Sequence, residues 1–170
     1  PVRLIAPDLL GHGDSAAPRD PRRYRTDETI ADLEALLDEL GISRAVVLGY
    51  SMGARLALHY ALRHPNTLQG LILVSGTAGL ENETERTTRR AWDHEQAEAL
   101  EEMGASAFMT QWEQHPLIAS GALGIPQAPY RHMMNRRRES RADALARSFR
   151  AFGTGTMPSA WDQLSLLPVP

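Results

Sequence analysis

The chain has 170 residues, of which 42% are hydrophobic and 23% are charged, and its formal net charge is −3. This size and composition are typical of one folded globular domain with a sizeable core. No apolar stretch approaches the ~20 residues that cross a bilayer, and acidic and basic residues are interspersed. The sequence therefore predicts neither a membrane nor a nucleic acid as a partner. The arginine-rich stretch from Arg131 to Arg141 is the local exception, and Glu139 interrupts it.

Two residue types are missing from the sequence, and this excludes several chemistries. The eighteen cationic side chains are all arginine, because the chain has no lysine, and there is no cysteine. A Walker-type phosphate loop and Schiff-base catalysis both need lysine. Thiolate catalysis, disulfides and cysteine-ligated metals are excluded as well. The composition is compatible with a cytoplasmic location, which we expect for this protein.

Three short apolar runs predict buried parallel strands: Val2 to Ala6, Ala45 to Leu48 and Leu71 to Val74. The two intervening segments have helical patterns. Strand, helix, strand, helix, strand is typical of an α/β fold with a parallel sheet and right-handed crossovers.

The first predicted helix runs from about Asp27 to Leu40, with Thr26 as its N-cap and Gly41 as its end. Leucine and isoleucine recur along it at helical spacing. The second predicted helix is the stretch "MGARLALHYALRH", which ends at His64 because Pro65 follows.

After Ser75 the pattern becomes helical throughout, without a convincing strand. The expected helices are roughly Glu81 to Met103, Ser106 to Gln114, Tyr130 to Asn135, Ala142 to Phe152 and Ser159 to Leu164. We predict three parts: residues 1–78 as the central part of the α/β core, 79–165 as an all-helical lid over the carboxyl edge of the sheet, and 166–170 as the start of a return to the core. Because the chain opens inside a strand-like run and stops at "LPVP", we expect it to be a fragment of a longer protein.

The stretch "LGYSMGA", residues 48 to 54, places Ser51 between two glycines, directly after a predicted strand and before a predicted helix. This is the pattern of a nucleophile elbow, a strained turn that projects the serine hydroxyl above the sheet. Gly49 and Gly53 leave room where strand and helix pack closely. The amide of Met52 lies at the helix N-terminus, where it can donate to an oxyanion. The alternative is a glycine-rich turn with a buried, hydrogen-bonded serine.

Histidines are the next requirement, because a serine elbow needs an activating base. In this arrangement the chain order is serine, acid, histidine. His12 precedes the serine, and we interpret it as a loop residue that packs beside the site. His59 and His64 lie on and after the elbow helix, and His94, His115 and His132 lie in the predicted lid. We assign none of the six as the catalytic histidine, and expect it and the acid to follow Pro170.

The stretches "APDLLGHGDS", "LGYSMGARLAL", "LILVSGTAGLENETERTTRRAWD", "FMTQWEQHPLIAS" and "TGTMPSAWDQLSLLPVP" resemble the α/β-hydrolase family over essentially the whole chain. Within it they are similar to lyases of menaquinone biosynthesis. The Gly-Leu-x-x-Glu-x-Glu-Arg-x-x-Arg stretch and the Trp-x-x-x-Pro-Leu segment are the specific parts of the likeness. Ala54 stands where a third elbow glycine is usual, and Ala78 replaces a usual proline.

The resemblance implies elimination of pyruvate from a cyclohexene that carries several carboxylates. Ser51 would act as a base activated by histidine, without being acylated, and the Met52 amide would serve as an oxyanion donor. A polyanionic substrate needs cations, and arginine offers a planar fork for each carboxylate. No metal and no cofactor are implied. The substrate-binding residues that the resemblance implies are Tyr50, Arg55, Arg89, Trp112 and Arg137, with Arg90 replacing Arg89 and Arg136 or Arg138 replacing Arg137 if the register shifts.

Each of these residues also has a plain structural interpretation. Arg55 could be a surface charge of its helix, and Arg89 could pair with Glu85 at i, i+4. Arg137 could belong to a solvated face, and Trp112 to the core of the lid. Two rival functions also stay open. The protein could be an esterase or carbon-carbon bond hydrolase that uses Ser51 as a nucleophile. It could also be no enzyme at all, either a non-catalytic relative that uses the pocket for binding or a truncated chain that never assembles a triad.

Overall fold

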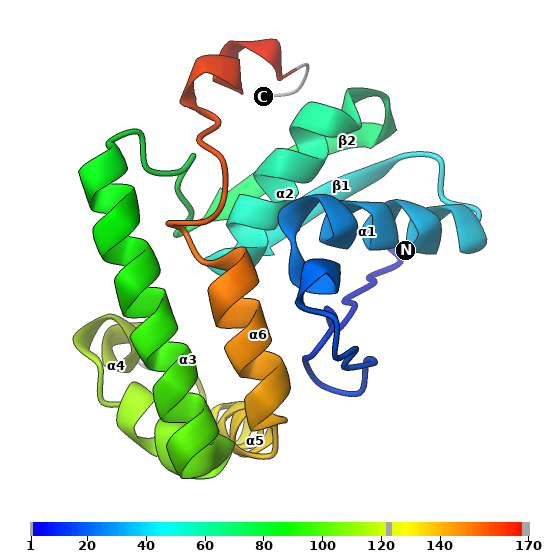
Figure 1. Cartoon of the computed structure of the whole chain (residues 1–170). Coiled ribbons are helices and arrows are strands. Elements are labelled where there is room, and N and C mark those ends of the chain that lie inside the picture. The colour runs from blue at the N-terminus through cyan, green and yellow to red at the C-terminus, as the bar shows by residue number, and fades with distance from the viewer. Residues whose placement is uncertain (1, 122–123, 168–170) are drawn as a thin grey trace.

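Two parallel strands form the sheet in the computed structural model, which describes residues 2–121 and 124–167. β1 (Ala45–Tyr50) pairs with β2 (Leu68–Val74). α2 (Met52–Arg63) connects the strands, and Figure 1 shows it on the same side of the sheet as α1 (Thr26–Glu39). The parallel α/β arrangement that the sequence predicts is thereby confirmed for these two strands.

The main hydrophobic core lies between the sheet and these two helices. Val47 and Leu71, which are neighbours in the strand register, point into it. Its fully buried residues come from α1, α2, β2 and the region of residues 152–157: Ile30, Leu56, Tyr60, Ala61, Leu68, Phe152 and Met157. Because Phe152 and Met157 belong to this core, the helical half of the chain is packed into the α/β half.

The opposite face of the sheet is apolar and exposed in the described part of the chain. Side chains on a strand alternate between the two faces, so the residues beside Val47 and Leu71 point away from the core. Leu48 is 64% exposed and its register partner Ile72 is 46% exposed. Val46, Tyr50 and Val74 are exposed on the same face.

The prediction of a strand from Val2 to Ala6 was wrong. This segment pairs with neither described strand, and Val2 and Leu4 are 95% and 89% exposed. An apolar run becomes a strand only when a neighbouring strand accepts its backbone hydrogen bonds. The other two strands are longer than predicted, by Gly49 and Tyr50 at the end of β1 and by Leu68 to Gly70 at the start of β2.

The ends of the first two helices are mostly as predicted. At the end of α1, the amide of Gly41 donates to the carbonyl of Asp38 (3.0 Å) and the amide of Ile42 to that of Leu37 (2.8 Å), which is a Schellman arrangement. At the start, the N-cap is Arg25 and not Thr26, which is already helical. α2 ends at Arg63, and the 3-10 helix η2 (Pro65–Thr67) follows.

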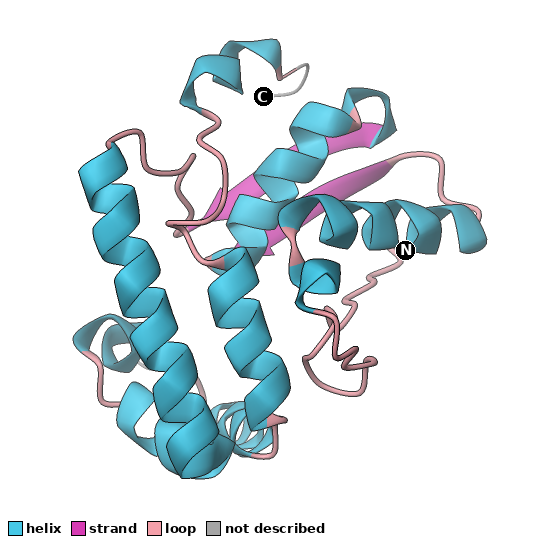
Figure 2. Cartoon of the chain, in the orientation of Figure 1, coloured by secondary structure: helices cyan, strands magenta, loops and turns pink. Residues whose placement is uncertain are grey.

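The second half of the chain is helical, as predicted: α3 (Glu83–Trp112), α4 (Pro116–Gly121), α5 (Gln127–Arg138), α6 (Ala142–Phe152) and the 3-10 helix η3 (Trp161–Leu166). The two helices predicted on either side of residue 104 are joined into α3, with a kink at Gly104, whose φ of 79° lies outside the helical region. α4 was not predicted, and α6 has its predicted bounds. Figures 1 and 2 show α3 and α6 running side by side, and the two helices are in contact.

A second hydrophobic cluster joins α3 to α6. Its buried members include Leu100, Phe108 and Leu145. Residues 168–170 lie outside the described part, so the predicted return to the core is described only as far as Leu167. That side chain packs against both the main core and a small cluster around Leu58.

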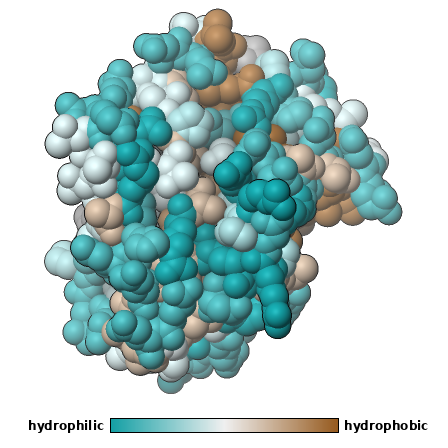
Figure 3. All heavy atoms as spheres, in the orientation of Figure 1, coloured by the Kyte–Doolittle hydropathy of each residue, from teal (hydrophilic) through white to brown (hydrophobic). Residues whose placement is uncertain are grey.

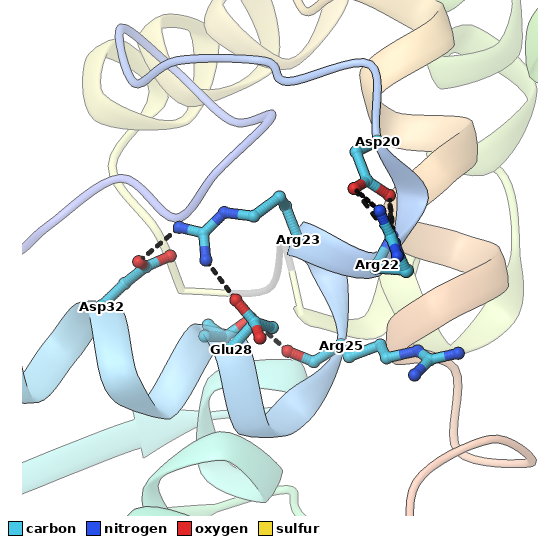
Figure 4. A network of polar contacts seen from close by, with 7 residues as sticks. Asp20, Arg22, Arg23, Arg25, Glu28 and Asp32 are labelled. Carbon is cyan, nitrogen blue, oxygen red and sulfur yellow. Dashed lines mark hydrogen bonds and ion pairs between the residues drawn. The ribbon is translucent and has the colours of Figure 1, made fainter.

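Polar contacts fix the loop before α1. Arg23 pairs with Glu28 and, at 2.7 Å, with Asp32, while Arg22 pairs with Asp20 at 2.8 Å (Figure 4). These charges are at the surface, where an ion pair contributes about 0–1 kcal/mol. The Arg23 pairs join the 3-10 helix η1 (Pro21–Tyr24) to α1, and η1 in turn contacts α6.

The molecular face seen in Figure 3 is mainly hydrophilic, with an apolar patch in the region of η3, where Leu166 is 70% exposed. No helix in the described ranges is long and apolar enough to cross a membrane.

We expect the isolated 170-residue chain to self-associate through its exposed sheet face. A contiguous apolar patch rimmed by unpaired strand edges favours association. Replacing Leu48 and Ile72 together by Gln removes apolar surface from this face, and light scattering and dye binding should both decrease. Ile125→Gln, which removes an exposed apolar side chain from a loop, is the matched control and should change neither. A monomer with a sharp, reversible thermal transition would contradict the expectation.

Candidate active site

Ser51 occupies the turn between β1 and α2 in a strained conformation. Its φ of 52° and ψ of −110° lie in a region that residues with a side chain rarely adopt. Such a conformation costs on the order of 1–3 kcal/mol and needs support from its surroundings. The amide of Ser51 donates to the carbonyl of Val74 (2.8 Å), and its carbonyl accepts from the amides of Ala54 and Arg55. The residue is exposed. This is the geometry of the elbow that the sequence predicts.

Close packing of strand and helix requires one of the two flanking glycines. A Cβ at Gly49 would lie 2.2 Å from the carbonyl oxygen of Gly53, a distance that no side chain tolerates. A Cβ at Gly53 would meet nothing within 4 Å. The expectation that both glycines make room with their missing side chains was therefore right for Gly49 and wrong for Gly53, which contributes its backbone.

The neighbours of Ser51 have the positions expected of an oxyanion donor and of a residue at the mouth of a site. Met52 is the first residue of α2, so its amide has no partner within the helix and points toward the helix N-terminus. Tyr50 ends β1 and is 56% exposed. Ala54 is buried against Gly76, whose missing Cβ would lie 2.7 Å from that of Ala54. The missing side chain of Gly76 thus makes room for the Ala54 methyl group.

Arg55 is not a surface charge of its helix. It is half-buried, and its Nη1 donates to the Thr154 hydroxyl (2.8 Å) and the Phe152 carbonyl (3.3 Å), with the Met157 sulfur also at 3.3 Å. Burial lowers the pKa of Arg55 to about 10, with a contribution from the positive charge of Arg89. The residue therefore keeps its charge at neutral pH.

Arg89 pairs with Asp93 one turn along α3, and not with Glu85 as the plain interpretation of the sequence suggested. Its Nε donates to Asp93 Oδ1 at 2.9 Å, and its guanidinium lies 4.6 Å from the centre of the Trp92 ring. The neighbouring Arg90 has other partners, since it pairs with Glu83 (2.5 Å) and donates to the Gly155 carbonyl (3.2 Å).

The three consecutive arginines of α5 differ in their partners. Arg136 pairs with Asp8 and Asp14, each at 3.4 Å, and Arg138 pairs with Glu113 at 2.5 Å. Arg137 is half-buried and forms no ion pair within the described residues. Of the three, Arg137 is thus the one whose charge is not already neutralised by a carboxylate of the described chain.

Trp112 lies at the centre of an aromatic cluster that joins α3 to α6. Its ring centre is 5.5 Å from that of Phe108, 5.6 Å from Phe149 and 5.8 Å from Trp92. It is half-buried. The interpretation of Trp112 as a core residue of the helical half is therefore correct as far as it goes, while its predicted contact with substrate stays a prediction.

His12, His59 and His64 each have neighbours other than the Ser51 hydroxyl. His12 packs beside Met52 in a small pocket, where its Nδ1 contacts the Leu10 carbonyl (3.1 Å) and burial lowers its pKa. His59 is buried in α2, and burial also lowers its pKa. His64 lies 3.1 Å from Glu34. Within the described residues, the Ser51 hydroxyl forms no hydrogen bond with a histidine.

A model of the alpha/beta hydrolase fold family matches residues 2–102. The chain belongs to the α/β-hydrolase family. A Serratia proteamaculans protein named 2-succinyl-6-hydroxy-2,4-cyclohexadiene-1-carboxylate synthase is 32% identical over 98% of the chain and 63% of its own length. A Bacillus subtilis protein that carries the same name provisionally is 36% identical over 99% of the chain and 61% of its own length.

Among solved structures, MenH from S. aureus superposes on this α/β-hydrolase with a TM-score of 0.87 at 32% identity. The match covers 96% of the chain and 60% of the MenH chain. The chain thus spans about three fifths of the length of these relatives.

Sequence reasoning missed two residues that contact the candidate substrate-binding arginines, Asp93 and Thr154. Asp93 is 2% exposed and lies between Arg89 and the loop after α6. Its i+4 spacing from Arg89 was a signal that could have revealed it. Thr154 had no such signal, because its contact with Arg55 joins residues 99 positions apart.

Gly49→Ala should destabilise the elbow more than Gly53→Ala. The first change forces a Cβ against the Gly53 carbonyl, and overpacking of this kind costs about 1–3 kcal/mol or more. The second places alanine in an open helical position, where it is favoured over glycine by about 0.5–1 kcal/mol. The free energy of unfolding, measured by denaturant titration of the full-length gene product, checks both. Equal effects would contradict this account of the elbow.

Proposed function

We propose that this protein is a lyase of menaquinone biosynthesis that eliminates pyruvate from 2-succinyl-5-enolpyruvyl-6-hydroxy-3-cyclohexene-1-carboxylate and leaves 2-succinyl-6-hydroxy-2,4-cyclohexadiene-1-carboxylate. The main support is an exposed, strained Ser51 that Arg55 follows one helical turn later. The chain is also similar to relatives that bear this enzyme's name. We also propose a cytoplasmic location, in keeping with the absence of cysteine.

In the proposed reaction Ser51 is the general base. It removes the proton from ring carbon C2, and the electrons of that C–H bond form a double bond between C2 and C3. The existing double bond moves from C3–C4 to C4–C5, and the bond between C5 and the enolpyruvyl oxygen breaks. The leaving group takes up a proton and becomes pyruvate. Negative charge that develops in the transition state is stabilised by fixed donors, and the Met52 amide at the start of α2 is one of them.

Ser51 needs a histidine to be basic enough for this role. None of the six histidines of the chain forms a hydrogen bond with its hydroxyl within the described residues. We therefore propose that the histidine and its acid come from polypeptide beyond this chain, as the greater length of the relatives allows. The helices of residues 79–165 act as a lid in this proposal.

The positive charges of the arginines complement the negative charge of the proposed substrate. The positive charge of Arg89 contributes to lowering the pKa of Arg55, so the two guanidinium groups repel each other. Two arginines held against their mutual repulsion favour a ligand with more than one carboxylate. Arg137 is the third candidate, because its two neighbours are each paired with carboxylates.

The rival function within the family is hydrolysis of an ester or a carbon-carbon bond with Ser51 as the nucleophile. The elbow alone supports it equally well. Such an enzyme has no need of several arginines around its substrate. A neutral aryl ester separates the two functions, since it offers an acyl group and no carboxylate.

Ser51→Ala should reduce pyruvate release about 10²- to 10⁴-fold, the usual contribution of a general base. The assay needs the full-length gene product, defined by reading the coding sequence on both sides of this segment. Ser75→Ala is the matched control, because Ser75 also follows a strand with a positive φ of 53°. Rapid ester turnover by the wild-type protein, without pyruvate release, would refute the lyase proposal.

Arg89→Ala and Arg137→Ala should each raise the KM about 10- to 100-fold, since a hydrogen bond to a charged group contributes about 1.5–3 kcal/mol. Steady-state kinetics of pyruvate release measure this. Arg136→Ala is the control and should leave the KM unchanged, because Arg136 is committed to Asp8 and Asp14. An equal rise in KM for Arg136→Ala would show that the wrong arginine of α5 has been assigned.

A further inference from the structure

The segment from Phe152 to Met157 contacts Arg55 directly and is linked to Arg89 through Asp93. It receives three contacts from Arg55 Nη1, at the Phe152 carbonyl, the Thr154 hydroxyl and the Met157 sulfur. Its two glycines lie against α3. A Cβ at Gly153 would lie 2.0 Å from Asp93 Oδ2, and a Cβ at Gly155 would lie 2.6 Å from a backbone carbonyl oxygen of α3. Glycine is therefore required at both positions for this segment to fit against α3.

Asp93 completes the connection on the α3 side. Its carboxylate is almost fully buried, and Oδ1 accepts from Arg89 Nε at 2.9 Å. Oδ2 has no hydrogen-bond partner within the described residues. Burial raises the pKa of Asp93, while the hydrogen bond and charge of Arg89 and the charge of Arg55 act in the opposite direction. The nearby backbone amide of Gly155 also lowers the pKa of Asp93, although it forms no hydrogen bond with Oδ2.

A carboxylate in this position is costly for folding. A buried charge whose second oxygen is unpaired loses hydration that one hydrogen bond does not replace. Its charge is nevertheless in the right place to reduce the repulsion between the two arginines. This combination, unfavourable for the fold and favourable for two neighbouring cations, is typical of a residue that serves a binding site.

The contacts use one edge of each guanidinium and leave another edge open. Arginine has five N–H donors in a fixed plane, and two neighbouring nitrogens form a fork that matches a carboxylate. The Nε of Arg89 donates a hydrogen bond to Asp93, and its guanidinium lies over the Trp92 ring. Its two Nη groups have no hydrogen-bond partner within the described residues. Arg55 uses Nη1, so its Nε and Nη2 are open in the same sense.

We propose that Asp93 and the segment Phe152–Met157 form a positioning platform that holds Arg89 and Arg55 by one edge each, so that their open edges make two forks for two carboxylate groups of one substrate. This inference rests on the proposed function and deepens it. The platform residues do not touch the substrate. They select polycarboxylates over monocarboxylates, because both forks are fixed in place before the substrate arrives.

Two pairs of variants of the full-length gene product test the platform. Asp93→Asn keeps the shape of the side chain and removes its charge, and its control is Asp143→Asn, which alters a surface pair of the same i, i+4 kind with Arg147. Thr154→Val removes the hydroxyl that Arg55 contacts, and Thr154→Ser keeps it. The measurements are the KM and kcat for pyruvate release, the Kd of tricarballylate and of butyrate by calorimetry, and the denaturation midpoint.

Asp93→Asn should raise the KM and the Kd of tricarballylate about tenfold or more, with kcat within about threefold and no loss in the denaturation midpoint. Thr154→Val should raise both constants about three- to tenfold, and Thr154→Ser should restore them. The Kd of butyrate should change less than that of tricarballylate, because one fork suffices for one carboxylate. Asp143→Asn should leave all five quantities as in the wild type.

Unchanged KM and Kd values in both Asp93→Asn and Thr154→Val would overturn the platform, as would a loss of stability without a change in either constant. The proposed function is judged separately. If the wild-type protein binds tricarballylate and the variants weaken it, but no pyruvate is released, the platform stands and the lyase proposal fails. If the wild-type protein neither releases pyruvate nor binds the tricarboxylate, both are refuted.

Discussion

The contact between Gly49 and Gly53 is the constraint on which the site depends. Because the backbone of α2 approaches that of β1 so closely, the chain must reverse direction within Ser51, and this residue takes a positive φ. The same turn sets the direction of α2, which places the Met52 amide beside the serine and Arg55 one turn further along. A serine, a helix N-terminal amide and a cation are thus positioned by one steric requirement, which the missing side chain of Gly49 satisfies.

The arginines show how a protein keeps like charges together. Arg55 and Arg89 come from different helices and would separate if only their own charges mattered. Asp93 and the segment after α6 hold them, at the cost of a buried carboxylate with one unpaired oxygen. In our proposal, substrate carboxylates complete the balance of charge. A buried ion pair of this kind contributes less to folding stability than well-packed neutral residues of the same size would.

Local features of this fold could be predicted from the sequence, and contacts across the chain could not. The Schellman end of α1 at Gly41 and the bounds of α6 depend on residues a few positions apart, and the patterns indicated them correctly. The Ser51 turn was equally visible, because a strand, two glycines and a helix all lie within a dozen residues. Thr154 was missed because its partner Arg55 lies 99 positions away, and no local pattern reports such a contact.

The failed strand prediction has the same cause and a wider meaning. The run from Val2 to Ala6 has the composition of a strand, yet a strand is a property of two neighbours and not of one segment. The described chain offers it no partner, just as it offers no cover for Leu48 and Ile72 on the exposed face of the sheet. Apolar pattern and structure agree wherever partners are present, in β1, β2 and the helices that pack on them. Where they disagree, at Val2 to Ala6 and on the exposed face of the sheet, the apolar pattern is the one expected of residues that a packing partner covers.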